Sequence, residues 1–85
     1  MVTIELFGVP RLRAGIARRN VAATTVGSAL MALVGEFPAL DDLLRYGEIH
    51  PAYRLSLNGE RFVTDLDTAL REGDSLLLLS ADVGG

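Results

Sequence analysis

At 85 residues, of which 49% are hydrophobic, the chain can form one domain around a modest core, and its composition excludes a disordered protein. Its net charge of −3 and its scattered basic residues argue against nucleic-acid binding. It lacks cysteine, an apolar run of membrane-spanning length and the layout of a signal peptide, so we expect a cytoplasmic protein that has no disulfides and binds no membrane.

The basic residues are all arginine, eight in number, and the chain contains no lysine. A GC-rich coding bias is the simpler explanation of this composition. The absence of lysine would also suit a protein whose terminal carboxyl group becomes activated, because no side-chain amine could then attack it.

The first predicted element is a strand over residues 2–7, in which alternate residues are apolar. Its even-numbered residues share one face, and Phe7 lies on the other. Residues 8–10 should end the strand, and residues 11–19 predict a basic connector without regular structure. A short strand over residues 20–23 would pair with the first as a hairpin.

A helix is predicted next, with Thr25 as its N-cap. Gly35 and Pro38 should end this helix. Residues 40–47 predict a second, short helix. The apolar stripe of the main helix comprises Val26, Ala29, Leu30, Leu33, Val34 and Phe37.

The remainder of the chain predicts three strands. Residues 53–57 alternate, and Asn58-Gly59 is a strong hairpin signal with residues 62–63 on the return strand. A tight turn at residues 72–74 leads into the last strand, residues 75–80. The expected architecture is therefore an α+β fold, a mixed four- to five-stranded sheet with one main helix packed on one face.

The last strand contains four consecutive leucines, so both of its faces are apolar. One face must lie on the helix, and the other is either covered by the connector or exposed as a docking patch. Counting alternate residues, we expect Phe7, Leu77 and Leu79, with Phe62 as a further candidate, to contact a partner. A register slip of one residue would instead expose Leu76 and Leu78.

The parts of an independent enzyme are missing. His50 is the only histidine, so no usual zinc or iron–sulfur ligand set can be assembled. The aspartate pairs are typical of turns and helix starts, and no phosphate-binding glycine loop occurs. We therefore expect no bound cofactor and no metal, and interpret His50 as a turn residue.

The chain ends in Asp82-Val83-Gly84-Gly85, directly after the apolar strand. Glycines can enter a narrow channel and adopt backbone angles closed to other residues. From Ser80 onward the tail could project its carboxyl group about 20 Å beyond the sheet. We expect one folded domain over residues 1–80 and an extended tail over residues 81–85 that carries a reactive carboxylate into another protein.

Five segments, in order, resemble the MoaD/ThiS family of β-grasp sulfur carriers, which are relatives of ubiquitin in fold. They are the opening strand Val2-Thr3-Ile4-Glu5-Leu6-Phe7-Gly8, the helix entry Thr25-Val26-Gly27-Ser28-Ala29-Leu30, the turns Leu57-Asn58-Gly59-Glu60 and Leu70-Arg71-Glu72-Gly73-Asp74, and the ending Val83-Gly84-Gly85. Together they span nearly the whole chain.

The resemblance implies a non-catalytic carrier. An adenylyltransferase of the ubiquitin-activating type, similar to MoeB and ThiF, would use ATP to adenylate the carboxylate of Gly85. A sulfur donor would then displace AMP and leave a thiocarboxylate. Gly84 would let the tail thread into its partners, and Ala81, Asp82 and Val83 would contact them.

The branch of the family stays open. Residues 37–53 resemble the molybdopterin synthase small subunit, which supplies sulfur to the large subunit, or the similar carrier for cysteine synthesis, more than the shorter thiamine carrier. The chain has Ser80-Ala81 where many small subunits have two prolines. We expect the molybdopterin branch, and the alternatives are a sulfur carrier for cysteine, thiamine or another sulfur-containing metabolite, a ubiquitin-like modifier of proteins, and a non-covalent β-grasp interaction module.

Overall fold

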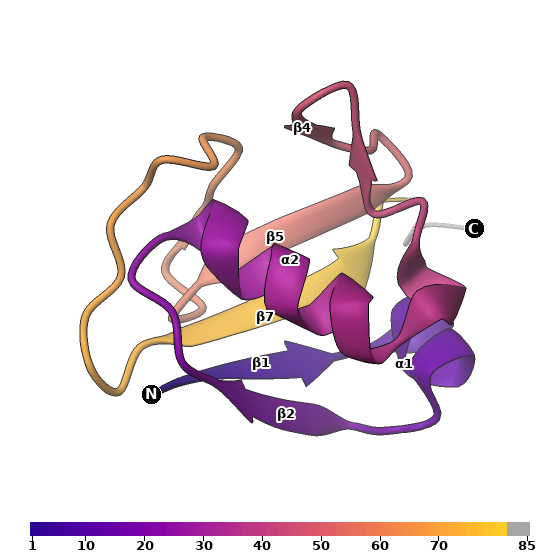
Figure 1. Cartoon of the computed structure of the whole chain (residues 1–85), viewed down its shortest axis with the longest axis horizontal. Helices are drawn as coiled ribbons and strands as arrows, with labels where there is room; N and C mark the ends of the chain where they lie inside the picture. The colour runs from indigo at the N-terminus through magenta and orange to yellow at the C-terminus, as the bar shows by residue number, and fades with distance from the viewer. Residues whose placement is uncertain (82–85) are drawn as a thin grey trace.

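The structure is a computed structural model that describes residues 1–81, and these form a mixed five-stranded sheet crossed by one helix (Figure 1). The strand order is β2-β1-β7-β5-β6. The central strand β7 is parallel to its neighbour β1, and the other pairs are antiparallel. The strands are β1 (Val2–Leu6), β2 (Arg18–Val21), β5 (Tyr53–Leu57), β6 (Arg61–Phe62) and β7 (Ser75–Ser80). The expected α+β architecture is confirmed.

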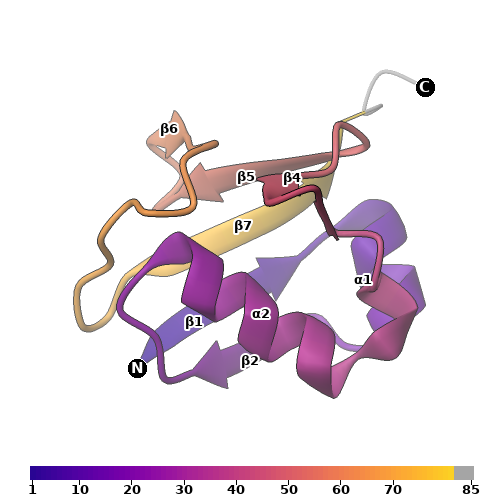
Figure 2. The same ribbon diagram turned by 45° about the horizontal axis from the view of Figure 1, so that its top comes forward.

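Helix α2 (Val26–Glu36) lies across one face of the sheet (Figure 2). Thr25 begins it with a capping box, in which its side chain accepts from the Ser28 N–H and the Ser28 side chain accepts from the Thr25 N–H, so the predicted N-cap is confirmed. The helix buries the first part of its predicted stripe, namely Val26, Ala29, Leu30 and Leu33. The core lies between these side chains and the inward residues of β1, β5 and β7.

The predicted connector over residues 11–19 is partly wrong, because α1 (Gly8–Ala14) begins directly after β1. Gly8, at φ +59°, turns the chain out of the strand, and Pro10 is accommodated in the first turn, where its missing N–H costs nothing. Gly15 ends the helix in the left-handed conformation. Only Pro10 is buried in this helix, so its sequence carries no apolar stripe from which to predict it.

The predicted helix over residues 40–47 is also wrong. A single 3-10 turn, η1 (Pro38–Leu40), is followed by a small hairpin of β3 (Leu44–Arg45) and β4 (Glu48–Ile49). Tyr46 and Gly47 turn this hairpin with φ of 54° and 75°. The leucine spacing that suggests a helix comes from Leu40 and Leu43, which are both fully buried although the backbone between them is not α-helical.

Three strands differ slightly from expectation. The first ends at Leu6 rather than Phe7, the second lies at residues 18–21 rather than 20–23, and the return strand β6 lies at residues 61–62 rather than 62–63. The Asn58-Gly59 hairpin turn is confirmed, with positive φ at both residues.

Within residues 1–81, no helix has both the length and the apolar character needed to cross a membrane.

Candidate partner-docking site

The leucines of β7 divide between the two faces of the sheet. Leu76 and Leu78 are fully buried beneath α2, whereas Leu77 and Leu79 point to the opposite face and are partly exposed. The expected alternation of this strand is therefore confirmed. Both views show α2 on the other side of the sheet, with α1 beside one end, so no helix within residues 1–81 covers this outer face (Figures 1 and 2).

The strand register gathers the predicted contact residues on this outer face. Phe62 pairs with Ser56, which in turn pairs with Leu77. Leu79 lies opposite Arg54, and the Phe7 N–H donates to the carbonyl of Leu78 beside it. Phe7 and Phe62 are 39% and 57% exposed, which is high for large apolar side chains. We define the docking face as Phe7, Arg54, Phe62, Leu77 and Leu79.

Arg54 is the member of the docking face that sequence reasoning missed. Its guanidinium carbon lies 5.3 Å from the centroid of the Phe62 ring, a cation–π distance. The signal was present, because the alternation of residues 53–57 that buries Tyr53 and Leu55 must turn Arg54 to the other face. The docking face is therefore an apolar surface that carries one positive charge.

The tail leaves the sheet beside this face. The Ala81 N–H donates to the Ala52 carbonyl over 2.7 Å, which continues the pairing of β7 with the segment before β5. Asp82, Val83, Gly84 and Gly85, which the sequence singles out, lie outside the described residues. The last described residue thus holds the base of the tail at the edge of the domain.

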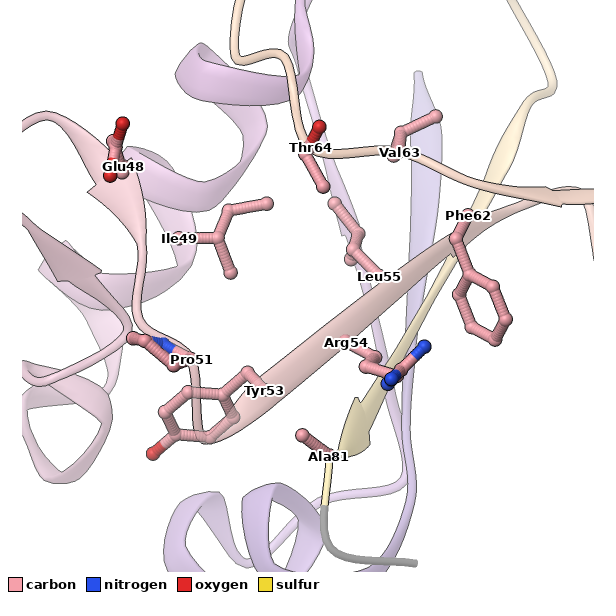
Figure 3. A pocket seen from close by; sticks show the side chains of 10 residues that line it. All are labelled: Glu48, Ile49, Pro51, Tyr53, Arg54, Leu55, Phe62, Val63, Thr64 and Ala81. Carbon is pink, nitrogen blue, oxygen red and sulfur yellow. The ribbon is translucent and has the colours of Figure 1, made fainter.

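A groove of about 500 Å³ opens beside the base of the tail, between the β3–β4 hairpin and β6 (Figure 3). Sequence reasoning missed it, because the hairpin that forms one wall was predicted as a helix. The side chain of Ile49 points across the groove toward Thr64 and Leu55 (Figure 3). The lining residues are Glu48, Ile49, Pro51, Tyr53, Arg54, Leu55, Phe62, Val63, Thr64 and Ala81.

A polar cluster fixes the start of β5 below this groove. The Tyr53 hydroxyl donates to Asp42 Oδ1 over 2.6 Å, and Arg13 Nη1 donates to Asp42 Oδ2 over 2.8 Å and to the Tyr53 hydroxyl over 2.7 Å. These three residues come from α1, the segment after η1, and β5. The cluster therefore ties three separate segments together close to the base of the tail.

The electrostatics of the cluster suit a structural role. Burial, and then the Asp42 carboxylate, raise the pKa of Tyr53 to about 12. Burial tends to raise the pKa of Asp42, but the hydrogen bonds from Tyr53 and Arg13 outweigh it and the pKa is lowered. The hydrogen bond to Asp42 raises the pKa of Arg13. A neutral phenol between a fixed anion and a fixed cation is well placed to hold the fold and poorly placed to transfer a proton near neutral pH.

The titratable side chains of residues 1–81 also bear on whether this part of the chain could hold a metal ion. Across residues 1–81, no three histidine, cysteine, aspartate or glutamate side chains gather in a way that could hold a metal ion. His50 Nδ1 accepts from the Ala52 N–H over 2.9 Å, so the interpretation of His50 as a turn residue is confirmed.

Comparison with known proteins gives structural relatives only. No protein-family model matches the chain, and no curated protein matches it. Among solved structures, small archaeal modifier protein 1 from Haloferax volcanii is 33% identical, with a TM-score of 0.82 over 93% of this chain and 92% of its own. This identity over nearly the whole length of both chains carries the family assignment.

Two further structures agree in fold. The Amycolatopsis orientalis BexX/CysO complex contains a chain 20% identical to this one, with a TM-score of 0.85 and full coverage of both. The complex of subunits 1 and 2 of molybdopterin-converting factor from Helicobacter pylori contains a chain 23% identical, with a TM-score of 0.64 over 93% of this chain and 90% of that one. The ordered motifs, the β-grasp sheet and the relative from Haloferax volcanii agree, and the chain belongs to the MoaD/ThiS family of ubiquitin-like β-grasp sulfur carriers and modifiers.

Proposed function

We propose that the chain is a sulfur carrier whose reactive group is the C-terminal carboxylate of Gly85. Membership of the family, together with a Gly-Gly ending that follows β7 after three intervening residues, is the observation that carries this proposal. The polar cluster is suited to holding the fold, and the docking face is apolar with one charge. Partner proteins are therefore expected to supply the catalytic groups. The reaction is expected to take place in the cytoplasm, where ATP is available.

The proposed chemistry has two steps. A carboxylate oxygen of Gly85 attacks the α-phosphate of ATP on an adenylyltransferase similar to MoeB and ThiF, which forms the acyl adenylate and releases pyrophosphate. Sulfide from a sulfur donor then attacks the carbonyl carbon and expels AMP, which leaves the thiocarboxylate and releases a proton. Adenylation is required because a carboxylate is a poor electrophile until its oxygen becomes part of a leaving group.

Each partner protein is proposed to bind the docking face while the tail enters the active site of that partner. Phe7, Phe62, Leu77 and Leu79 supply the apolar contact, and Ala81, Asp82 and Val83 line the entry of the tail. Gly84 lets the last residues pass a narrow channel, because it has no side chain. Two relatives in fold were solved as complexes with a second protein, which supports a protein partner.

Intact mass measurement tests the proposal. The protein is incubated with the activating enzyme from the same cell, ATP and a sulfide source. We expect a mass gain equal to the replacement of one oxygen by sulfur, mapped to Gly85. A matched variant without Gly85 should show no gain. Normal adenylation and thiolation of this shortened variant would overturn the proposal.

The sulfur acceptor is proposed to be the large subunit of molybdopterin synthase. The likeness to subunit 1 of a molybdopterin-converting factor supports this choice, and the likeness to CysO supports cysteine synthesis as the alternative. Offering the thiocarboxylate to each acceptor enzyme separately distinguishes them, because only the true acceptor should release the carboxylate form of the carrier.

A second candidate function is covalent modification of proteins. It is favoured by the name of the 33% identical relative, a small archaeal modifier protein. Peptides from cell extracts in which Gly85 is joined to a lysine side chain would support this function. Their absence under conditions that thiolate Gly85 would argue against protein modification and leave the carrier function as the remaining candidate. The chain has no lysine, so it offers no side-chain amine to a second activated copy.

A further inference from the structure

The outer edge of β5 is only partly covered by its neighbour. The pairing of β5 with β6 ends at Ser56 and Phe62, although the Val63 N–H still donates to the Leu55 carbonyl over 2.9 Å. The Leu55 N–H points to the same edge, and within residues 1–81 it donates to no backbone carbonyl outside the strands, although the Val63 carbonyl would be its antiparallel partner. Leu55 is 1% exposed, so this donor sits at the floor of the groove with little access to water.

A second backbone group at the same edge is also free. The Tyr53 N–H donates to the His50 carbonyl over 3.0 Å, but the Tyr53 carbonyl accepts no hydrogen bond from the described part of the chain. Buried backbone groups are nearly always paired in native proteins. One donor and one acceptor, two residues apart on one strand, therefore indicate a missing backbone partner.

The spacing of these two groups specifies the direction of that partner. In a parallel pair, one residue donates to the residue before its opposite number and accepts from the residue after it. A residue opposite Arg54 would thus donate to the Tyr53 carbonyl and accept from the Leu55 N–H. A residue of an antiparallel strand opposite Leu55 would have to donate its N–H to the Leu55 carbonyl, which already accepts from the Val63 N–H. The parallel direction is therefore favoured.

The walls of the groove specify the side chains. A residue paired with Arg54 projects to the same face as Arg54, whose guanidinium forms no ion pair within residues 1–81. An acidic side chain at this position would complement that charge. Its neighbours would point to the opposite face, where Ile49 and Val63 offer apolar contact (Figure 3).

We infer that the groove is a docking site for an extended segment of a partner protein, which adds to the edge of β5 in the parallel direction with an acidic residue opposite Arg54 between apolar residues. The partner is the chosen occupant because Arg54 and Phe62 belong both to the groove and to the docking face. A protein that covers that face reaches the edge of β5 as well. The choice of a partner protein as the occupant rests on the proposed function. The unpaired backbone groups at the edge of β5 are observed independently of that function.

The probe is the capped peptide acetyl-Gly-Val-Val-Asp-Val-Val-Gly-amide, titrated into the isotope-labelled full chain and followed by backbone amide NMR shifts. We expect the largest shift at the Leu55 amide. Methylation of the aspartate backbone nitrogen removes the donor to the Tyr53 carbonyl and should abolish binding. Methylation of the nitrogen of either valine adjacent to the aspartate should not, because those groups point away from β5. No shift at about 1 mM peptide, or equal effects of all methylations, would overturn the inference.

Charge reversal gives a second readout. Arg54→Glu should weaken binding of the aspartate peptide about tenfold, and a peptide with lysine in place of aspartate should recover the loss. Arg61→Glu, a matched change at an exposed arginine of β6 that does not line the groove, should leave affinity unchanged. Equal weakening by the two variants would contradict a role for Arg54.

Direction and occupant are tested with the same peptide. A nitroxide at its N-terminus should broaden the Ala52 amide, and one at its C-terminus the Ser56 amide, whereas the reverse pattern would overturn the parallel arrangement. A Leu55 shift that depends on protein concentration, or one caused by removing residues 82–85, would assign the groove to a second copy or to the chain's own tail instead. None of these measurements requires activation of Gly85, so failure here and failure of the carrier function are separable.

Discussion

The hydroxyl of Tyr53 donates a 2.6 Å hydrogen bond to Asp42. This bond joins the first residue of β5 to the segment that follows η1. Arg13 adds α1 to the same point by donating to both residues. Ala52, the residue before Tyr53, accepts a hydrogen bond from the Ala81 N–H at the base of the tail. The cluster that stabilises the fold therefore also fixes the position of the base of the tail.

Removing the Tyr53 hydroxyl should destabilise the protein without unfolding it. Tyr53→Phe keeps the buried ring but leaves Asp42 without one of its two side-chain donors. We expect the free energy of unfolding to fall by about 1–2 kcal/mol in denaturant titrations. Tyr46→Phe is the matched control at a tyrosine that is 93% exposed, and a comparable loss there would show that the hydrogen bond is not the cause.

The ionisation of Tyr53 should be visible at high pH. In the Tyr46→Phe background Tyr53 is the only tyrosine, so tyrosinate absorbance should report a pKa of about 12. The folded pKa lies above the unfolded value of about 10, so the associated stability is present below pH 10 and lost as the pH rises toward 12. Asp42→Asn should lower the pKa of Tyr53, and an unchanged titration would refute the contribution of the carboxylate.

The lowered pKa of Asp42 predicts acid sensitivity. A carboxyl group whose pKa is lower in the folded state stabilises above its unfolded value of about 4, and that stability is lost as the pH falls through the folded value. Unfolding midpoints measured from pH 6 downward should therefore fall less steeply in Asp42→Asn than in the parent. Parallel curves for the two proteins would contradict the prediction.

Two glycines of α2 should respond oppositely to alanine. A methyl group on Gly27 would lie 3.1 Å from the Leu66 carbonyl oxygen and 3.2 Å from Leu66 Cβ, while the Gly27 N–H donates to that same carbonyl over 2.8 Å. We expect Gly27→Ala to destabilise by about 1 kcal/mol despite the better helix propensity of alanine. Gly35→Ala faces open space and should stabilise by about 0.5–1 kcal/mol, which thermal unfolding of both variants can check.

Asn58 should contribute through both its backbone and its side chain. It adopts φ +56°, its Oδ1 accepts from the Ser75 N–H over 2.8 Å and its Nδ2 donates to Asp74 over 3.1 Å. Asn58→Ala loses the hydrogen bonds and strains the turn, so we expect a cost of about 2 kcal/mol. Asn58→Gly relieves the strain and should cost less than Asn58→Ala, and equal costs measured by chemical unfolding would exclude a backbone effect.

Adjacent leucines of β7 should separate docking from folding. Leu79→Asp changes a partly exposed residue of the docking face, so we expect a folded protein whose affinity for the activating enzyme falls at least tenfold. Leu78→Asp places a charge in the core, where the parent residue is 0% exposed, and should unfold the protein. Circular dichroism and binding measurements on both variants decide. A folded Leu79→Asp protein with unchanged affinity would refute the docking face.

The strands and the main helix could be predicted because their periodicity is expressed in the sequence. β1 buries alternate residues, the apolar residues of β5 alternate in the sequence, and Thr25 marks the start of α2 by a side-chain hydrogen bond that acts locally. The division of the leucines in β7 followed from the same alternation. These signals lie within short stretches of the sequence, so they can be recognised without knowledge of tertiary contacts.

The groove and the polar cluster could not be predicted, because tertiary contacts create them. Pro10 is the only buried residue of α1, and Leu40 and Leu43, whose spacing imitates a helix, are buried in the segment that leads into the hairpin of β3 and β4. Arg13, Asp42 and Tyr53 are brought together from three segments, and nothing in their local sequence indicates that they meet.

The central position of β7 has a mechanical consequence. This strand pairs with β1 over residues 75–78 on one side and with β5 over residues 76–80 on the other, and the hydrogen bonds run between strands rather than along them. A protein that pulls on the residues after Ala81 along that axis loads both ladders in shear, so many bonds resist together rather than opening one after another. The position of β7 between two strands should therefore make the domain resist traction on its tail better than a strand at the edge of the sheet would.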